Sequence, residues 1–283
     1  MAPRLSPHMT VMQNAAQKAA RRLLRDFAEV EQLQVSIKGP SDFVSAADLR
    51  AETTIREELE RARPGYGMLA EEGGESGSQK WDWRWVVDPL DGTTNFLHGI
   101  PHWAISIALQ KRAPDGSAEI VAGMIYNPAG NEMFWAEKGI GAYLNDRRLR
   151  VSARREMSEA LLATGIPFGA SSPRARLPFA RTLGTLMPQV AGIRRFGSAA
   201  LDLAWVAAGR YDGYWELGVK AWDVAAGVLM VREAGGYASD AGGAEIQALD
   251  TEIPTVVAAN TQLHVKLRTL VAEGVETTAT PNA

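Results

Sequence analysis

The chain has 283 residues, 46% hydrophobic and 22% charged, with a formal net charge of −3, a composition ordinary for a globular protein with a large core. The weak negative charge gives no electrostatic reason to expect nucleic acid as the main partner. The sequence holds no cysteine, which excludes disulfides, thiolate metal sites and thiol nucleophiles. No apolar run approaches the roughly 18 residues of a membrane span and no secretory leader is recognisable, so we expect a cytoplasmic protein with no membrane partner.

Two helices followed by a series of strands are predicted for the first half of the chain. Apolar residues recur at helical spacing over residues 9–34, and a second helix is predicted over 45–63, before Pro64-Gly65. Helices followed by strands are typical of an α+β lobe with a largely antiparallel sheet. The predicted strands cover residues 67–71, 83–87, 103–110, 120–126 and 132–136.

In the second half, predicted strands and helices alternate, which favours a layered α/β lobe. We therefore predict an N-terminal α+β lobe of residues 1–155 and a C-terminal α/β lobe of residues 156–283. The tail beyond Gly274 is expected to be frayed. The predicted elements are strands at 161–164, 211–216 and 256–259, helices at 174–190, 198–208 and 223–234, and a C-terminal helix.

The run from Asp88 to Thr94 (DPLDGTT) follows the strand predicted at 83–87. Pro89 and Gly92 are expected to end that strand directly behind Asp88, on a turn that a rigid element holds. Carboxylates at such a position suit Mg²⁺, and amides that follow the glycine can receive an anion if a helix begins there. The same residue types are common in ordinary turns. The motif alone therefore leaves open a plain turn or a metal site beside a phosphate site.

Other acids have the same two interpretations. Glu71 and Glu72 end the strand predicted at 67–71, and since neighbouring side chains on a strand point to opposite faces, only one is expected to face a site. Asp223 opens the helix predicted at 223–234, where aspartate is a favoured N-cap. Asp48 lies three residues after Ser45, in a pattern that can be a capping box. Each acid could cap or end an element, or bind a cation.

Taken together, these segments resemble the two signatures of inositol monophosphatases. The matching segments are Glu71-Glu72, Trp85 to Phe96 (WVVDPLDGTTNF) and Trp222 to Gly227 (WDVAAG). Gly197 to Ala204 (GSAALDLA) and Lys38 to Ser45 (KGPSDFVS) resemble the bacterial branch of that family. The resemblance runs from about residue 10 to residue 270. It is specific for the superfamily and much less specific for the substrate.

The resemblance implies a layered αβαβα sandwich, the sugar-phosphatase fold, in a homodimer with two or three Mg²⁺ ions per site. The first ion would be held by Glu71, Asp88 and the backbone carbonyl of Leu90. The second would be held by Asp88, Asp91 and Asp223, with Asp88 bridging the two. A third, weaker ion is expected near Glu71.

The same resemblance implies the catalytic groups. One cation would activate a water as the nucleophile, and the pair would clamp the attacking and leaving oxygens. Thr93 and Asp48 would orient and deprotonate that water, with Glu71 as a further catalytic residue. The backbone around Gly92, Thr93 and Thr94 would neutralise charge on the phosphoryl oxygens.

Substrate contacts are implied for Asp91, the backbone at Ala199, and Glu216. The expected partner is a small phosphate monoester, and the expected reaction is the lithium-sensitive hydrolysis of a polyol or sugar phosphate. Inositol 1-phosphate is the leading candidate substrate. The metal motif recognises the phosphate and not the alcohol. Histidinol phosphate, fructose 1,6-bisphosphate, a 3′-phosphoadenosine nucleotide and NADP therefore stay open as substrates, as does a non-catalytic regulatory role.

Overall fold

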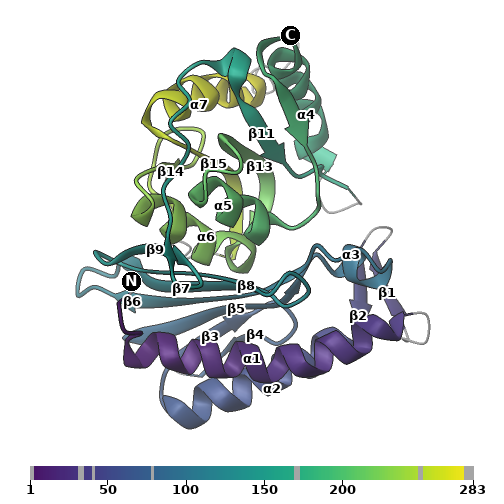
Figure 1. Ribbon diagram of the computed structural model, residues 1–283, viewed down its shortest axis with the longest axis vertical. Coiled ribbons are helices and arrows are strands. Elements are labelled where there is room, and N and C mark those ends of the chain that lie inside the picture. The colour runs from purple at the N-terminus through teal and green to yellow at the C-terminus, as the bar shows by residue number, and fades with distance from the viewer. Residues whose placement is uncertain are drawn as a thin grey trace.

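The computed structural model describes most of the chain as two stacked lobes, each built around one β-sheet (Figure 1). A small two-stranded hairpin, β1 with β2, lies beside the first lobe. The described residues are 3–30, 35–39, 42–77, 80–168, 173–247 and 251–276.

The first lobe contains an eight-stranded sheet with the strand order β10-β9-β8-β7-β6-β5-β3-β4. All neighbouring strands in it are antiparallel except β3 and β5, which are parallel. The largely antiparallel sheet and its five predicted strands are confirmed, whereas the hairpin, β4, β9 and β10 were not predicted. The bounds are β1 (Val35–Gly39), β2 (Asp42–Ser45), β3 (Gly67–Ala70), β4 (Gly74–Ser76), β5 (Trp83–Asp91), β6 (Ala104–Arg112), β7 (Ala118–Asn127), β8 (Glu132–Glu137), β9 (Gly141–Leu144) and β10 (Arg147–Arg148).

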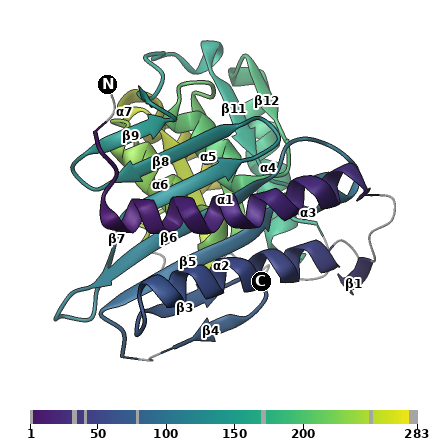
Figure 2. The same ribbon diagram turned by 60° about the horizontal axis from the view of Figure 1, so that its bottom comes forward.

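Two long helices, α1 (Pro7–Ala28) and α2 (Ala46–Ala62), cover the outer face of this sheet (Figure 2). Helix α1 begins at Ser6, whose hydroxyl oxygen accepts from the Met9 N–H at 3.2 Å, a regular N-cap. Its buried stripe of alanine and methionine packs with α2 and with tryptophans of the sheet in one apolar cluster. The helix ends at Ala28, earlier than predicted, and the predicted residues 31–34 lie outside the described ones.

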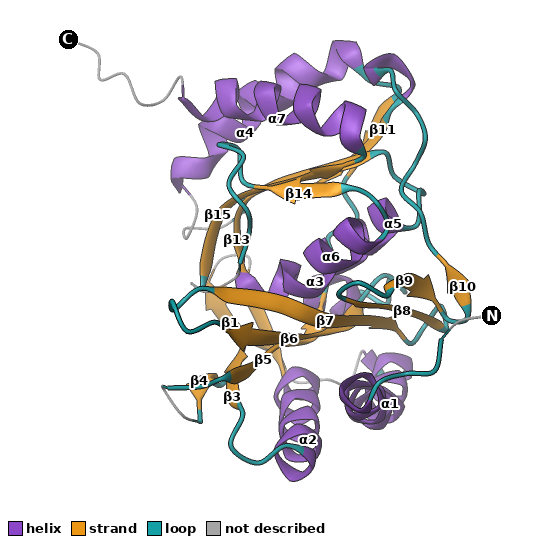
Figure 3. Ribbon diagram, turned by 90° about the vertical axis from the view of Figure 1, so that its left-hand side faces the viewer, coloured by secondary structure: helices purple, strands orange, loops and turns teal. Residues whose placement is uncertain are grey.

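The second lobe contains a five-stranded sheet of order β12-β11-β13-β15-β14, in which β12, β11 and β13 are parallel. Helices α5 and α6 lie between the two sheets, and α4 and α7 cover the far face (Figure 3). The predicted strands and helices of this half are present; β12 and β14 were not predicted. The bounds are β11 (Leu161–Thr164), α4 (Pro173–Leu186), β12 (Gly192–Arg194), α5 (Ala199–Ala207), β13 (Gly213–Lys220), α6 (Ala221–Glu233), β14 (Tyr237–Ser239), β15 (Glu252–Ala259) and α7 (Thr261–Glu276).

The layers are therefore helix, sheet, helix, sheet, helix, which is the predicted αβαβα sandwich. Three apolar clusters fill the interfaces: one between the outer helices and the first sheet, one around α5 and α6 that reaches both sheets, and one between the second sheet and α4 with α7. Helix α6 approaches the first sheet so closely that a Cβ at Gly123 of β7 would lie 2.9 Å from the Ala226 Cα. This close packing holds the start of α6 near the acidic edge of the first sheet.

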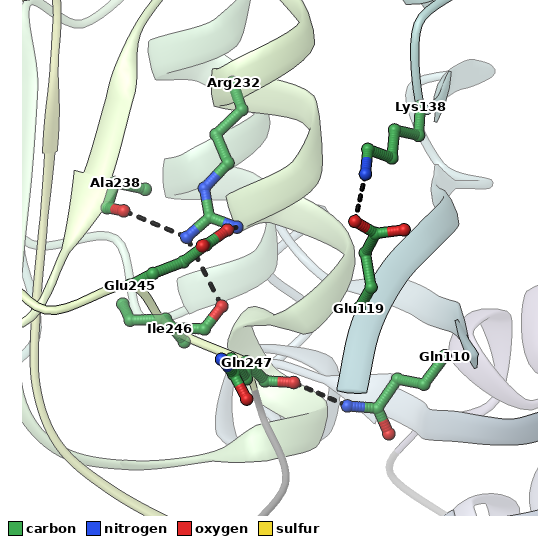
Figure 4. A network of polar contacts seen from close by, with 8 residues as sticks. All are labelled: Gln110, Glu119, Lys138, Arg232, Ala238, Glu245, Ile246 and Gln247. Carbon is green, nitrogen blue, oxygen red and sulfur yellow. Dashed lines mark hydrogen bonds and ion pairs between the residues drawn. The ribbon is translucent and has the colours of Figure 1, made fainter. Parts of the chain in front are cut away.

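A second link between the lobes lies at the opposite end of α6 (Figure 4). Arg232 forms an ion pair with Glu245 at 2.7 Å and donates to the Ala238 carbonyl at 3.1 Å. Arg232 also donates to the Ile246 carbonyl at 3.3 Å, and the carbonyl of the next residue, Gln247, accepts from the Gln110 amide of β6 at 2.7 Å. The C-terminal lobe is thus fastened to the sheet of the first lobe by hydrogen bonds as well as by apolar packing.

Among the described helices, none has both the length and the apolarity needed to cross a membrane. The chain passes from one sheet to the other between β10 and β11. The division into lobes of residues 1–155 and 156–283 stays a prediction.

Candidate metal and active site

Glu71 and Asp88 meet because β3 and β5 are parallel neighbours. Ala70 pairs with Val87, and the Glu71 N–H donates to the Val87 carbonyl at 3.2 Å. Parallel strands bring their carboxyl ends to the same edge of a sheet, so the residues that follow lie side by side. The two carboxyl groups lie within hydrogen-bond range of each other. Of the adjacent glutamates, Glu71 faces this site.

Strand β5 continues through Pro89 to Asp91, so the prediction that it ends behind Asp88 is wrong. The register with β6 shifts between Asp88 and Asp91, which identifies a β-bulge. Proline lacks an N–H and is tolerated at such a position. The Asp88 Oδ1 accepts from the Leu90 N–H at 2.9 Å, and the Leu90 carbonyl accepts from the Thr93 hydroxyl, also at 2.9 Å. The bulge therefore directs both acids and the Leu90 carbonyl toward one region.

The bulge is followed by Gly92, which has φ +90° and is the N-cap of the short helix α3 (Thr93–Leu97). The Thr93 hydroxyl lies 3.2 Å from the Asp48 Oδ2 and 2.9 Å from the Leu90 carbonyl. Asp48 lies in the first turn of α2 and is buried. Thr93 and Asp48 are therefore in contact although 45 positions separate them, whereas the side chain of Thr94 is exposed.

The C-terminal lobe contributes the partners of Asp91. Its Oδ2 accepts from the Ser198 hydroxyl at 2.5 Å and from the Ala200 N–H at 2.8 Å, and the Ala199 N–H also binds the carboxylate. Burial raises the pKa of Asp91 to about 6, while these hydrogen bonds act against the rise. Ser198 is the N-cap of α5. The sequence signals that cap through a serine at a helix start, but not its contact with a residue 107 positions away.

Asp223 lies in the first turn of α6, at N3 and not at the predicted N-cap. The N-cap is Lys220, whose N–H donates to the Asp223 Oδ2 at 2.8 Å. Because α6 packs against β5 and β6, Asp223 lies within electrostatic range of Glu71, Asp88 and Asp91. The second lobe therefore adds its acid to those of the first.

Burial is the main cause that raises the pKa of Glu71, Asp88 and Asp223 well above ordinary values, and repulsion between neighbouring carboxylates adds to it. In the described residues, no three His, Asp or Glu side chains are arranged so that they could hold a metal ion as they stand. The set nevertheless fits hard divalent cations, since it offers carboxylate oxygens and the Leu90 carbonyl within one crowded region. We expect a cation to draw these mutually repelling groups together.

Beyond Asp91, toward α5, lies the predicted substrate residue Glu216 of β13. Its Oε2 accepts from the Tyr214 hydroxyl at 2.7 Å, and burial raises its pKa to about 7. The carboxylate packs against Gly165, where a Cβ would lie 1.7 Å from the Glu216 Oε1. Any larger residue at position 165 would therefore displace Glu216.

Two charged residues here were not singled out from the sequence. Asp202 of α5 is buried, and within the described part of the chain its Oδ1 has no hydrogen-bond partner. Burial and repulsion by Glu216 and Asp91 raise its pKa. Arg195 acts in the opposite direction on Asp202 and Glu216. Asp202 lies in a helix and Arg195 directly follows β12. In sequence both look structural, because no local pattern reports a partner on another element.

Known proteins match this chain over nearly its whole length. The model of the inositol monophosphatase family matches residues 5–276. The inositol-1-monophosphatase of Rhizobium meliloti is 55% identical over 235 residues, which cover 83% of this chain and 86% of that protein. The Nus factor SuhB of Xylella fastidiosa is 43% identical over 95% of this chain and 96% of that one. The crystal structure of the extragenic suppressor protein suhB from Bartonella henselae superimposes with a TM-score of 0.86 at 49% identity, covering 95% and 100% of the two chains.

The layered sandwich, the acids at the edge of its first sheet and these relatives define the class of protein as a phosphatase for small phosphate esters. Within that class, the chain belongs to the inositol monophosphatase family. Resemblance to this family, seen first in the sequence motifs, is therefore confirmed.

Proposed function

We propose that this phosphatase hydrolyses inositol 1-phosphate to inositol and phosphate, with two or three Mg²⁺ ions per site. The observation that carries the proposal is the gathering of Glu71, Asp88, Asp91 and Asp223 from both lobes around the Leu90 carbonyl. Four carboxylates within range of one another, with Asp88 buried and the other three half-buried, are unfavourable without a counter-charge. Their arrangement is understandable if a cation supplies that charge.

The ligands of the proposed ions follow from the donor set. Glu71, Asp88 and the Leu90 carbonyl would hold one ion, and Asp88, Asp91 and Asp223 would hold the other, with a third ion near Glu71. When bound, such ions lower the pKa of a water and neutralise charge on the phosphoryl oxygens.

The protein's own groups supply the rest of the chemistry. Thr93 and Asp48 are in hydrogen-bond contact, so a water that donates to the Thr93 oxygen can pass its proton toward the Asp48 carboxylate. In this proposal the backbone N–H groups of residues 92–94, at the start of α3, would bind the phosphate. Their positive ends stabilise negative charge on the transferred group.

The alcohol end of the substrate is assigned to the second lobe. Glu216 would accept from a sugar hydroxyl, together with Asp91, whose charge acts on Glu216, and the backbone at Ala199, which binds Asp91. The Tyr214 hydroxyl already uses one oxygen of Glu216, which leaves the other for a substrate. A polyol matches this set of acceptors better than an apolar alcohol does.

A phosphate-release panel tests the proposal. Inositol 1-phosphate, histidinol phosphate, fructose 1,6-bisphosphate, a 3′-phosphoadenosine nucleotide and NADP would be compared by kcat/KM, with Mg²⁺, with Mg²⁺ and LiCl, and with EDTA. We expect inositol 1-phosphate to rank first, EDTA to abolish release and Li⁺ to inhibit it. If another ester has the highest kcat/KM, that ester is the substrate instead of inositol 1-phosphate. Phosphate release that EDTA does not change would overturn the metal assignment.

A regulatory role beside catalysis is a second candidate, because relatives such as that of Xylella fastidiosa are named Nus factors. An Asp91→Asn variant separates the two roles, since it removes a proposed cation ligand while changing little packing. If a cell that lacks the protein is rescued by this inactive variant, the regulatory role stands. Loss of both functions in the variant would leave catalysis as the role.

We further propose that the protein is a cytoplasmic homodimer. Several large apolar side chains of the second lobe are exposed, among them Phe168 and Met187, and a second copy would remove such side chains from water. Light scattering after gel filtration tests this, and a monomer at micromolar concentration would contradict it.

A further inference from the structure

Asn95 joins the two lobes through hydrogen bonds of its side-chain amide. It lies in α3 and is 7% exposed. Its Nδ2 donates to the His102 carbonyl at 2.8 Å and to the Phe196 carbonyl at 2.7 Å, with the Gly197 carbonyl farther away at 3.5 Å. An amide nitrogen carries two hydrogens, so the two short bonds use both, one in each lobe.

The turn that Asn95 holds in the second lobe lies beside the proposed substrate-binding backbone. Phe196 and Gly197 directly precede Ser198, the N-cap of α5, and Gly197 has φ +82°. Residues 198–200 bind the Asp91 carboxylate, and this stretch includes the backbone proposed to contact the substrate. We call residues 196–200 the substrate turn.

On its other side, Asn95 directly follows the proposed phosphate-binding residues 92–94, here called the phosphate loop. The carbonyl of Asn95 accepts from the Ile100 N–H at 2.9 Å, so the same residue also shapes the segment that leads to His102. The segments are in backbone contact, since a Cβ at Gly92 would lie 3.0 Å from the His102 carbonyl and 3.4 Å from the Gly197 carbonyl. The backbones of the phosphate loop and the substrate turn therefore have little room to move relative to each other.

The second link between these segments is of a different kind. It runs from Asp91 to Ser198 and Ala200, through a carboxylate whose charge also serves the proposed cation site. Asn95 is neutral, so its link does not depend on metal occupancy or on the protonation of an acid. The amide can therefore hold the spacing in every state of the site.

We propose that Asn95 is a positioning residue that sets the separation between the phosphate loop and the substrate turn. It thereby makes the enzyme selective for esters whose alcohol part contacts that turn. This inference rests on the proposed hydrolysis of a polyol phosphate. Asn95 touches neither the phosphate nor the alcohol in this scheme, and it acts through the backbone carbonyls that it holds.

The chain offers a matched control in Asn260. It is also buried, at 4% exposure, and its Nδ2 donates to the Ser152 and Arg154 carbonyls at 2.8 and 2.7 Å. It directly follows β15, whose last residue Ala259 pairs with the start of β13, whereas Asp223 lies beyond the end of β13. Each asparagine thus donates to two backbone carbonyls, at opposite ends of the second sheet. Both bonds of Asn260 go to one segment, residues 152–154, and its Oδ1 also accepts from the first turn of α7.

The experiment compares Asn95→Ala and Asn95→Asp with Asn260→Ala and Asn260→Asp in the full chain with Mg²⁺. Two substrates are used: inositol 1-phosphate, or the leading ester of the panel, and 4-nitrophenyl phosphate, whose flat alcohol part has no hydroxyls for the turn. We expect the Asn95 variants to lower kcat/KM for the polyol ester by about 30-fold, since displacements near 1 Å cost up to 100-fold. For 4-nitrophenyl phosphate the change should stay within about threefold, and the Asn260 variants should leave the ratio unchanged.

A second measurement needs no substrate. Hydrogen exchange of the backbone amides at 198–203 should accelerate at least tenfold in Asn95→Ala and stay unchanged in Asn260→Ala, because only the former releases the substrate turn. If wild-type protein hydrolyses no ester, the proposed function and the selectivity fail, while this exchange experiment still decides whether Asn95 holds the substrate turn.

Equal losses on both esters, with unchanged exchange at 198–203, would overturn the positioning role. So would failure of both Asn95 variants to fold while their Asn260 counterparts fold, since Asn95 would then be a structural residue. The aspartate variants matter here because they keep the volume of the side chain and only replace the donor with an acceptor that the carbonyls repel.

Discussion

Asp88 and Asp212 are both 2% exposed, yet their surroundings are opposite. Asp212 forms an ion pair with Arg154 at 3.2 Å and accepts from the Leu161 N–H at 2.7 Å. Asp88 accepts from one backbone N–H, and the charged groups around it are other carboxylates. Burial of a charge costs free energy in both places, but only around Asp212 does the protein itself provide the compensation.

The difference separates a structural region from a functional one. At the start of β13 the carboxylate is satisfied by the fold and helps to specify it. At the ends of β3 and β5 the compensation is left to something outside the chain. Buried like charges are arranged in this way where a cation or substrate completes the set.

The largest expected effect is on turnover. Asp88→Asn should lower kcat for the leading ester by about 10³-fold, which corresponds to about 4 kcal/mol of activation free energy. The reason is that the change removes charge from the carboxylate proposed to bridge two ions, with little loss of packing. Asp212→Asn should leave kcat within about threefold. Steady-state kinetics at saturating Mg²⁺ checks both, and comparable rates for the two variants would erase the distinction between the regions.

Much of this difference could be predicted from sequence, because the strands and the acids that follow them carry local signals. The strand-like segments of the first half and the helices before them were enough to predict a largely antiparallel first sheet. The acids of residues 71–91 were singled out because each follows a strand. Their convergence with Asp223 came from resemblance to a family and not from spacing.

What the sequence could not reveal depends on contacts between distant elements. Proline at position 89 signals a strand end, and only the pairing with β6 turns that break into a bulge. The partners of Asn95 and of Asp91 in the second lobe lie about 100 positions away. No local pattern encodes such a pair, since the geometry arises only when both sheets have packed on α5 and α6.

The second-largest expected effect is the stabilisation of the fold by Mg²⁺. Mg²⁺ at about 100 times its dissociation constant should stabilise the wild-type fold by about 2.7 kcal/mol through mass action. For a chain of this size that corresponds to about 5 °C or more in melting temperature. Thermal melts in Mg²⁺ and in EDTA measure it. Asp212→Asn should keep the full shift and Asp88→Asn should lose most of it, so identical midpoints for wild type in both buffers would refute a shared cation site.

A smaller effect concerns pH. Burial raises the pKa of Glu216 to about 7 although the Tyr214 hydroxyl bond opposes the rise, while glutamate in an unfolded chain titrates near about 4.3. Between these values the folded state keeps a proton that the unfolded state has lost. The contribution of Glu216 to stability is therefore fully present below about pH 4.3 and is lost as the pH rises to about 7.

Urea unfolding in EDTA at about pH 5 and pH 7.5 tests this sign. The stability difference between wild type and Glu216→Gln should move against wild type by about 2 kcal/mol over that interval. The amide has no titration and keeps the shape of the side chain. A difference that is constant with pH would contradict the raised pKa.

The smallest effect is on the free energy of unfolding without metal. It compares the two regions most directly, because the change has one sign for Asp88 and the opposite sign for Asp212. In EDTA, Asp88→Asn should raise the free energy of unfolding by about 1 kcal/mol, since it removes one member of a repelling group. Asp212→Asn should lower it by about 1–2 kcal/mol, since it breaks an ion pair and weakens a buried hydrogen bond. Urea titration of both variants beside wild type measures the two shifts. If both variants were destabilised alike, Asp88 would be held by the fold as Asp212 is, and the crowding of acids around it would no longer require a cation.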